Sequence, residues 1–293
     1  MRKKSVGQNK LTRGLAQALG REQPPTSYAT DRKMVALIVG AGAVQNAWAP
    51  VLRAVQPYYD FPLNGDGVNS FLARLVYLLR WFASIGDTNE LTKHKTFLAE
   101  VRQRICDELR DAEERGELSV RSSFESVVER FVVDRSNTFL LINTNWDEVV
   151  DKALLRILHD RFLVTLRPLH VHGSIAHQHM LYLPTEVTRE PYRTPEEDKE
   201  IGTIHGSIMR GLEGVTHVVV YGLSLSPLDA ELCQTLASGW NNATLRQIDV
   251  IVPDHDLVAN RVNMLLNPKR TVAVTGYHPD QLDTPIDYTV RRD

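Results

Sequence analysis

The stretch MVALIVGAGAV, from Met34 to Val44, joins a continuous apolar run to a glycine turn, and the following VQNAWAPVLRAVQ has helical spacing. This order predicts a strand, a loop large enough to hold a phosphate, and a helix. Strong apolar runs recur at TFLLIN, RPLHVHG, THVVVYGLSL, RQIDVIVP and RTVAVTG. Because continuous apolar runs are typical of strands buried on both faces, we predict an α/β fold with a doubly wound, mainly parallel, Rossmann-like sheet.

Two segments depart from this pattern. Residues 1–33 hold eight Lys or Arg against two acidic residues, which predicts a basic N-terminal arm in front of a body at 34–293. From about 57 to 136, apolar residues recur every three or four positions, so we expect a helical subdomain inserted into the sheet domain. A later charged, proline-rich stretch, LPTEVTREPYRTPEEDKEIG, predicts a surface loop leading into a helix.

The bulk composition is that of an ordinary globular protein, with 43% hydrophobic and 24% charged residues. A net charge of −2 gives no reason for the body to bind nucleic acid, so we expect such contact only through the arm or a partner. The N-terminus lacks a signal-like apolar region and no stretch is long enough to span a membrane, which favours a cytoplasmic protein. The two cysteines, Cys106 and Cys233, exclude a four-cysteine zinc module and are interpreted as core thiols.

In an open α/β sheet, ligands bind beyond the carboxyl ends of the strands, so the residues that follow each apolar run are candidates for one site. Gly40, Ala41 and Gly42 follow the first run and precede a predicted helix. Glycines allow close approach to a ligand, and a helix N-terminus favours phosphate. A simple tight turn is the alternative, since Gln45 occupies the third glycine position of the dinucleotide fingerprint.

The stretch LLINTNWDEVVDKALL, from Leu140 to Leu155, places Thr144, Asn145 and Asp147 between a strand and a helix. Asn145 is a favoured helix N-cap residue and Glu148 stands three positions later, as a capping box requires. The residues themselves leave two interpretations open. Asn145 either caps the helix or points into a ligand site.

The remaining junctions are LHVHGSI and YGLSLSPLDAEL. His170 and His172 share one face of a predicted strand, and with His177 and His179 they leave a metal cluster as an alternative. In the second junction, Pro227 and Leu228 are expected to open a helix, with Ser226 as cap or ligand contact. Gly222 and Ser224 are the other candidates there, and VIVPDHD forms a weaker fifth junction.

Together the four junctions resemble the sirtuin superfamily, and more closely its bacterial sirtuin-like defence branch, over roughly residues 34–276. Motifs of that branch commonly look like Thr-Asn-Tyr-Asp, His-x-His-Gly-Ser and Gly-Tyr-Ser-Leu-Ser. The matching residues are Thr144-Asn145-Trp146-Asp147, His170-Val171-His172-Gly173-Ser174 and Gly222-Leu223-Ser224-Leu225-Ser226, with Gly40-Ala41-Gly42 before them.

The resemblance implies an NAD-binding domain and a role for each matching residue. Asn145 would hold the ribose or an attacking water, His172 would act as the base, and Asp147 would orient the loop or the ribose. The implied NAD contacts are Gly40, Ala41, Gly42, Thr144, Gly222 and Ser224, with no metal.

Three departures narrow the range of activities that the resemblance implies. Ala43, Val44 and Gln45 stand where deacetylating sirtuins usually continue with Ile-Ser, and their Gly-Ile-Pro-Asp-Phe-Arg run and zinc module are missing. These departures argue against a groove for acyl-lysine peptides, whereas cleavage of NAD with water as acceptor remains chemically reasonable.

We therefore expect an NAD+ hydrolase that produces nicotinamide and ADP-ribose, used to deplete NAD in antiphage defence. The alternatives are a non-catalytic NAD or ADP-ribose sensor, a protein deacylase or ADP-ribosyltransferase, and an unrelated α/β enzyme such as a histidine-metal hydrolase. The resemblance also implies a homo-oligomer and, as partner, a HerA-type hexameric ATPase or a short Argonaute.

Overall fold

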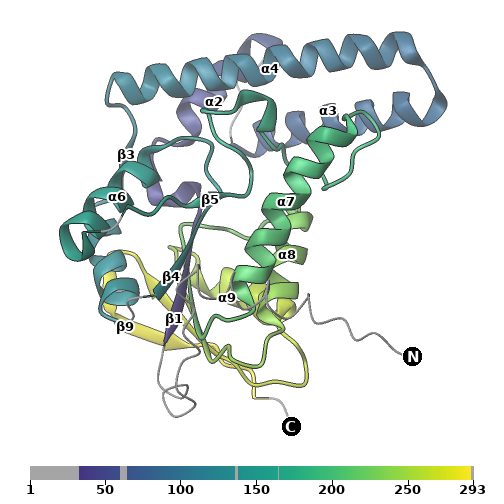
Figure 1. Ribbon diagram of the computed structural model, residues 1–293. Helices are drawn as coiled ribbons and strands as arrows, with labels where there is room; N and C mark the ends of the chain where they lie inside the picture. The colour runs from purple at the N-terminus through teal and green to yellow at the C-terminus, as the bar shows by residue number, and fades with distance from the viewer. Residues whose placement is uncertain (1–32, 60–64, 136–137, 164, 292–293) are drawn as a thin grey trace, which may run out of the picture. The chain divides into compact units, whose positions relative to one another are not determined.

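The centre of the computed structural model is a seven-stranded sheet in the order β5-β4-β1-β6-β7-β8-β9 (Figure 1). Every neighbouring pair from β5 to β8 is parallel, and only β9 runs antiparallel to its neighbour. This confirms the predicted α/β fold with a mainly parallel sheet. The strands are β1 (Met34–Val39), β4 (Thr138–Asn143), β5 (Leu169–His170), β6 (His217–Tyr221), β7 (Gln247–Ile251), β8 (Ala273–His278) and β9 (Gln281–Asp287).

The strand order reverses beside β1. The chain passes from β1 to β4 and β5 on one side, and then returns to β6, β7 and β8 on the other. Leaving β9 aside, this is the 3-2-1-4-5-6 order of Rossmann-like sheets, in which a crevice forms where the order reverses. The structure describes residues 33–59, 65–135, 138–163 and 165–291, so the predicted basic arm lies outside the described residues except for Lys33.

Helices cover both faces of the sheet. The longer ones are α2 (Trp48–Val55), α3 (Gly65–Ile85), α4 (Thr88–Glu114), α6 (Val149–Phe162), α7 (Pro195–Leu212), α8 (Ala230–Trp240) and α9 (His255–Leu265). Shorter elements are α5 (Phe124–Val127), the 3-10 turns η1 (Ala41–Ala43), η2 (Gln56–Tyr58) and η4 (Gln178–Met180), and the π-helical η3 (Val128–Val133). Within the described residues, no helix is both long and apolar enough to cross a membrane.

Alternate residues of β1 serve the two faces. Ala36 and Ile38 pack in one hydrophobic cluster with the apolar sides of α7, α8 and α9. Val35, Leu37 and Val39 pack in the other cluster with α2, α3, α4 and α6. All five side chains are fully buried, and burial of each larger one stabilises the fold by about 1.5–3 kcal/mol. Burial on both faces explains why the run is apolar without alternation.

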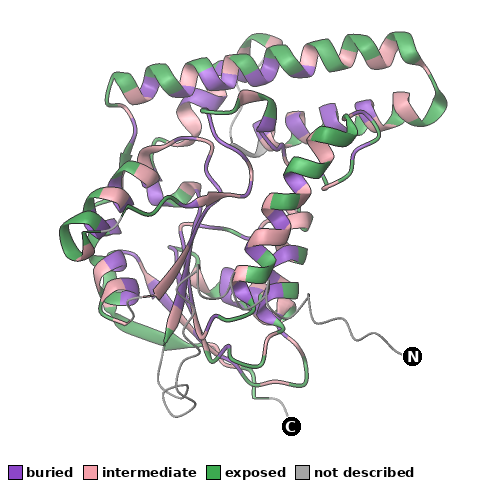
Figure 2. Cartoon of the chain, viewed as in Figure 1, coloured by how far each residue is buried: buried purple, intermediate pink, exposed green. Residues whose placement is uncertain are grey.

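The chain between β1 and β4 is largely helical. In α4, apolar residues such as Leu98, Val101, Ile105 and Leu109 recur at three and four residue intervals and are buried, while the opposite face is exposed (Figure 2). Asp87 caps this helix by accepting a hydrogen bond from the Glu90 amide. These buried residues belong to the same cluster as one face of the sheet.

Three local expectations are wrong. The helix after the glycine turn begins at Trp48, because Val44 and Gln45 form a short strand, β2, paired with β3 (Ser119–Val120), and Asn46 adopts a positive φ of 59°. Only the first two residues of LHVHG are in a strand. The charged stretch before α7 is not simply a surface loop, since Glu186 and Glu190 are buried.

Candidate functional site

A cavity of about 360 Å³ lies at the carboxyl ends of the strands, beside the point where the strand order reverses. Its volume is typical of small-molecule sites. Of the predicted site residues, Ala41, Gly42, Thr144, Asn145, Asp147, His172, Gly222 and Ser224 line it. Gly40 is buried behind the lining. The fold thus brings together residues from the loops that follow β1, β4, β5 and β6.

The interpretation of Asn145 as a helix cap is wrong. Helix α6 begins at Val149 with Glu148 at the N-cap position, and Glu148 makes no side-chain cap hydrogen bond in the described chain. The Asn145 side chain is only 4% exposed, and neither its oxygen nor its nitrogen has a hydrogen-bond partner among the described residues. A buried unpaired amide costs about 1–3 kcal/mol, so the side chain is in a position that a ligand would satisfy.

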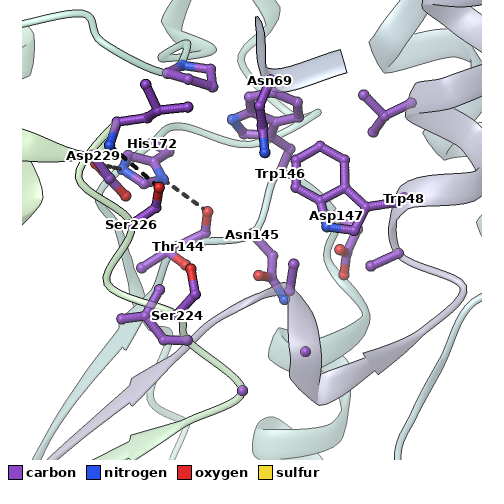
Figure 3. A pocket seen from close by; sticks show the side chains of 18 of the residues that line it. Trp48, Asn69, Thr144, Asn145, Trp146, Asp147, His172, Ser224, Ser226 and Asp229 are labelled. Carbon is purple, nitrogen blue, oxygen red and sulfur yellow. Dashed lines mark hydrogen bonds and ion pairs between the residues drawn. The ribbon is translucent and has the colours of Figure 1, made fainter. Parts of the chain in front are cut away.

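The backbone of Asn145, in contrast, is held on both sides. Its N–H donates to the side-chain oxygen of Asn143 at 3.0 Å, and its carbonyl lies 3.1 Å from Nδ1 of His170. The Asn143 amide and the other His170 nitrogen both reach the Asp151 carboxylate, at 2.8 and 2.9 Å. Asn143, Asp151 and His170 therefore fix the loop and leave the Asn145 side chain free to face the cavity (Figure 3).

Asp147 is almost completely buried, at 3% exposure, and lines the same cavity. One carboxylate oxygen accepts the Val149 amide at 3.1 Å, so Asp147 rather than Asn145 supports the start of α6. Burial raises the pKa of Asp147 to about 6, and the nearby Glu113 adds to the rise. Asp147 is thus a carboxyl group that changes charge just below neutral pH.

His172 is held between two acceptors. Its Nδ1 lies 3.1 Å from the Thr144 carbonyl and its Nε2 lies 3.1 Å from a carboxylate oxygen of Asp229. Neutral imidazole donates to only one acceptor, whereas the charged ring donates to both. Burial lowers the pKa of His172, but Asp229 and the Thr144 carbonyl outweigh burial, and the pKa is raised above 6.5. The Tyr182 ring stacks on the imidazole with 5.7 Å between centroids.

The glycines of the two loops are required by their contact with each other. A Cβ on Gly40 or Gly42 would come within 2.6 or 2.8 Å of the Gly222 carbonyl, and Gly222 itself has a φ of +65°. The Gly40 amide donates to Tyr221 and the Gly42 amide to Gly222, so neither is free for a phosphate. The two hydrogen bonds of the η1 turn do not use the Ala41 amide. Ala41 is therefore better placed than Gly40 or Gly42 to donate a hydrogen bond to a phosphate.

The Gly222–Asp229 loop differs from the predicted helix start. Helix α8 begins at Ala230 with Asp229 at the N-cap position, and Ser226 accepts from the Leu228 amide within a turn. The expected start of a helix at Pro227 and Leu228 is therefore wrong. Ser224 and Ser226 both line the cavity, and the Ser224 carbonyl accepts from Arg261 at 2.7 Å.

Several lining residues were not among the predicted site residues. Asp229 is the most important, because it pairs with His172 across 57 residues of sequence and no local motif marks it. The predicted helical insertion contributes Asn69 from α3 and Leu109 from α4. Trp48 and Trp146 lie on one side of Asn145, with His172 on the other (Figure 3).

Apart from His172, the cavity lining carries acidic but not basic side chains. Asp147, Asp229 and Asp254 line it, and among the described lining residues there is no lysine or arginine. Such a lining favours hydroxyl groups and positive charge in the part of a ligand that lies beside these carboxylates. No group of three or more His, Cys, Asp or Glu in the described part of the chain is arranged to hold a metal ion.

Comparison with models of known protein families gives no match to this chain, and comparison with curated proteins gives none either.

Proposed function

We propose that this protein hydrolyses NAD+ at the bond between nicotinamide and ribose, with water as the acceptor, to give nicotinamide and ADP-ribose. The observation that supports this most is Asn145, whose buried side chain has no partner in the described chain and shares a cavity with His172. A ribose hydroxyl or a water molecule would satisfy that amide. The order of the four loop motifs resembles that of sirtuin-like proteins, and this resemblance is the reason for proposing NAD+ as the ligand.

The proposed reaction breaks the bond from ribose C1′ to the nicotinamide nitrogen and forms a bond from C1′ to the water oxygen. The bonding electrons leave with nicotinamide, which becomes neutral. One water proton is released to neutral His172, whose ring must give up its contact with Thr144 or Asp229 to accept it. Asn145 positions the water or ribose without adding charge. Positive charge develops on the ribose as the bond breaks, and the Asp147 and Asp229 carboxylates in the cavity wall stabilise that charge when ionised.

The proposal also assigns the remaining contacts. The Ala41 amide serves the diphosphate together with the Gly222–Ser226 loop, while Gly40 and Gly42 act by allowing the two loops to pack. Thr144 donates its hydroxyl and amide to the Val39 carbonyl, so it holds the loop and presents its own carbonyl to His172. Its role is therefore support rather than direct contact with NAD.

We propose depletion of NAD in cytoplasmic antiphage defence as the biological setting, on the resemblance alone. In that setting a homo-oligomer would be held inactive until a partner responds to infection. A HerA-type hexameric ATPase and a short Argonaute are the partner classes to test.

Release of nicotinamide from NAD+ by the full chain, alone and with its native partner, tests the proposal. We expect Asn145→Ala and His172→Ala to reduce the rate of nicotinamide release by about 10²- to 10⁴-fold. The control variant Asn267→Ala, at an exposed amide that contacts Asn241, should retain wild-type activity. Wild-type protein that releases no nicotinamide in either state, or an Asn145→Ala variant as active as wild type, would show the proposal to be wrong.

A second candidate is a non-catalytic sensor of NAD or ADP-ribose. The internal use of the Gly40 and Gly42 amides favours it, because these glycines are explained without catalysis. If calorimetry shows that the protein binds ADP-ribose but does not turn over NAD+, the sensor function would be supported. Cleavage of NAD+ with an acylated peptide as the acceptor in preference to water would instead show that the protein is a deacylase.

A further inference from the structure

Residues 182–193, here called the bridging segment, lie between the helical insertion and the His172–Asp229 pair. The start of the segment contacts the histidine directly: the Tyr182 amide donates to the His172 carbonyl at 2.9 Å and the two rings are nearly parallel. The Thr185 amide donates to the Leu228 carbonyl at 2.8 Å, next to Asp229. One segment therefore contacts His172 itself and the residue that precedes Asp229.

Glu186 holds the bridging segment together from inside. Its carboxylate accepts the Leu183 amide at 2.6 Å and the Tyr192 hydroxyl at 2.7 Å, and it pairs with Arg193 at 2.9 Å. Its carbonyl accepts the Tyr182 hydroxyl at 2.6 Å. Burial alone would raise the pKa of Glu186, but arginine side chains outweigh burial and the pKa is lowered, so the carboxylate stays charged.

Both helices of the insertion reach this segment, each through one arginine. Arg102 of α4, which is 8% exposed, donates to both oxygens of Glu186 at 3.1 and 3.2 Å. Arg80 of α3 donates to the Thr185 carbonyl at 2.6 Å and to the buried Glu190 carboxylate at 2.8 Å. A buried carboxylate is stabilised by such partners, so movement of the helices would leave Glu186 with Arg193 as its remaining ion-pair partner and destabilise this conformation of the segment.

We infer that Arg102 and Arg80 are positioning residues for the His172–Asp229 pair, so that the α3–α4 insertion controls the cavity through the bridging segment. This inference takes the role of His172 from the proposed function, but its geometry stands without it. A partner that displaced α3 or α4 would loosen Tyr182 and Thr185, and with them the histidine and its carboxylate.

The test measures the titration of His172 by NMR in the full chain, with the resonance assigned from His172→Gln. Asp229, Glu186, Tyr182 and His205 are the titratable groups around this ring. We expect Arg102→Met and Arg80→Met to lower the pKa of His172 toward 6.5, because the ring loses its fixed contact with Asp229. Loss of a nearby cation alone would raise that pKa, so the sign separates repositioning from a direct charge effect.

Further variants keep the test decisive. Arg53→Met breaks exposed pairs from α2 to Glu108 and Glu117 and should leave the titration of His172 unchanged. If Arg102→Met does not fold, the sign test rests on Arg80→Met, because adding Glu186→Gln would remove a carboxylate that itself raises the pKa of His172. Arg102→Lys should restore the wild-type titration in part.

Turnover gives a second readout. If the chain hydrolyses NAD+, Arg102→Met should lower kcat by about 10- to 100-fold, as small misplacements of reacting groups do, with a smaller change in KM. A titration of His172 that is unchanged or raised in both arginine variants would overturn the inference. A shifted titration in a protein that does not hydrolyse NAD+ would support the inference and contradict only the proposed function.

Discussion

The Nε2 atom of His172 lies 3.1 Å from a carboxylate oxygen of Asp229. The pair joins the loop after β5 to the residue that precedes α8, across the strands between them. Because the Thr144 carbonyl faces the other ring nitrogen, His172 is surrounded by acceptors, and its charged form is favoured.

This arrangement predicts how activity depends on pH. A base accepts a proton only in its neutral form, so the rate should rise with pH through a midpoint above 6.5. Asp229→Asn removes the carboxylate that stabilises the charged ring, so the rising limb should move to lower pH. The plateau rate should also fall by about tenfold or more because the ring loses its orientation. The pH profile of kcat checks both effects, and identical profiles for the two proteins would contradict the pairing.

Asn145 and Asn143 should respond oppositely to truncation. Asn145→Ala removes a buried amide without a partner in the described chain, so the free energy of unfolding should stay the same or increase by about 1 kcal/mol while activity is lost. Asn143→Ala removes hydrogen bonds to the Asn145 amide and to Asp151, and should reduce that free energy by about 2 kcal/mol. Urea unfolding of both variants measures the difference. Equal destabilisation would mean that Asn145 serves the fold.

Asp147 should make stability depend on pH. Its pKa is about 6 in the folded protein and 3.8 as the ordinary value, so the unfolded chain loses its proton first and stability falls as pH rises between the two. Asp147→Asn avoids this cost and should be more stable than wild type by about 2–3 kcal/mol above pH 7, with the advantage vanishing near pH 3. Thermal unfolding across that range provides the measurement, and an advantage independent of pH would rule out the titration as its cause.

Gly222→Ala tests whether the glycine serves the packing of the two loops. Its Cβ would lie 2.2 Å from the Ala43 nitrogen, at a backbone φ of +65°. We expect a loss of about 3–5 kcal/mol, from overpacking and left-handed strain together. Gly86→Ala is the matched control, since φ is +71° there with no described atom within 4 Å, and should cost about 1–2 kcal/mol. Similar losses in the two variants would mean that backbone strain alone explains the glycine.

The strands were predictable because the signal for each is local. The apolar run of β1 reports burial on both faces, and the same is true of β4, β6 and β7. β9 was missed because its residues are mostly exposed and include Pro285, so it has the composition of a loop. The predicted length of β5 is too great because the sequence alternation continues to His172, whereas the strand ends at His170.

The details of the site depend on contacts that are distant in sequence. Glu148 stands where a capping box would place it, but its amide donates to the Glu113 carboxylate of α4 at 2.7 Å. The position of Glu148, and with it the failure of the capping box, thus depends in part on a residue of the insertion. Contacts between residues distant in sequence also pair Asp229 with His172. Such contacts bury Glu186 as well, in a stretch that has the composition of a loop.

The wall of the cavity consists of residues between Ala41 and Val258, from loops and helices that the strands of the sheet bring together. During translation, Gly42 and Asn145 emerge long before Asp229 and Asp254, and until those later residues leave the ribosome the cavity does not exist. If the chain hydrolyses NAD+ as proposed, it would gain that activity only near the end of its synthesis, and products truncated before Asp229 would lack it.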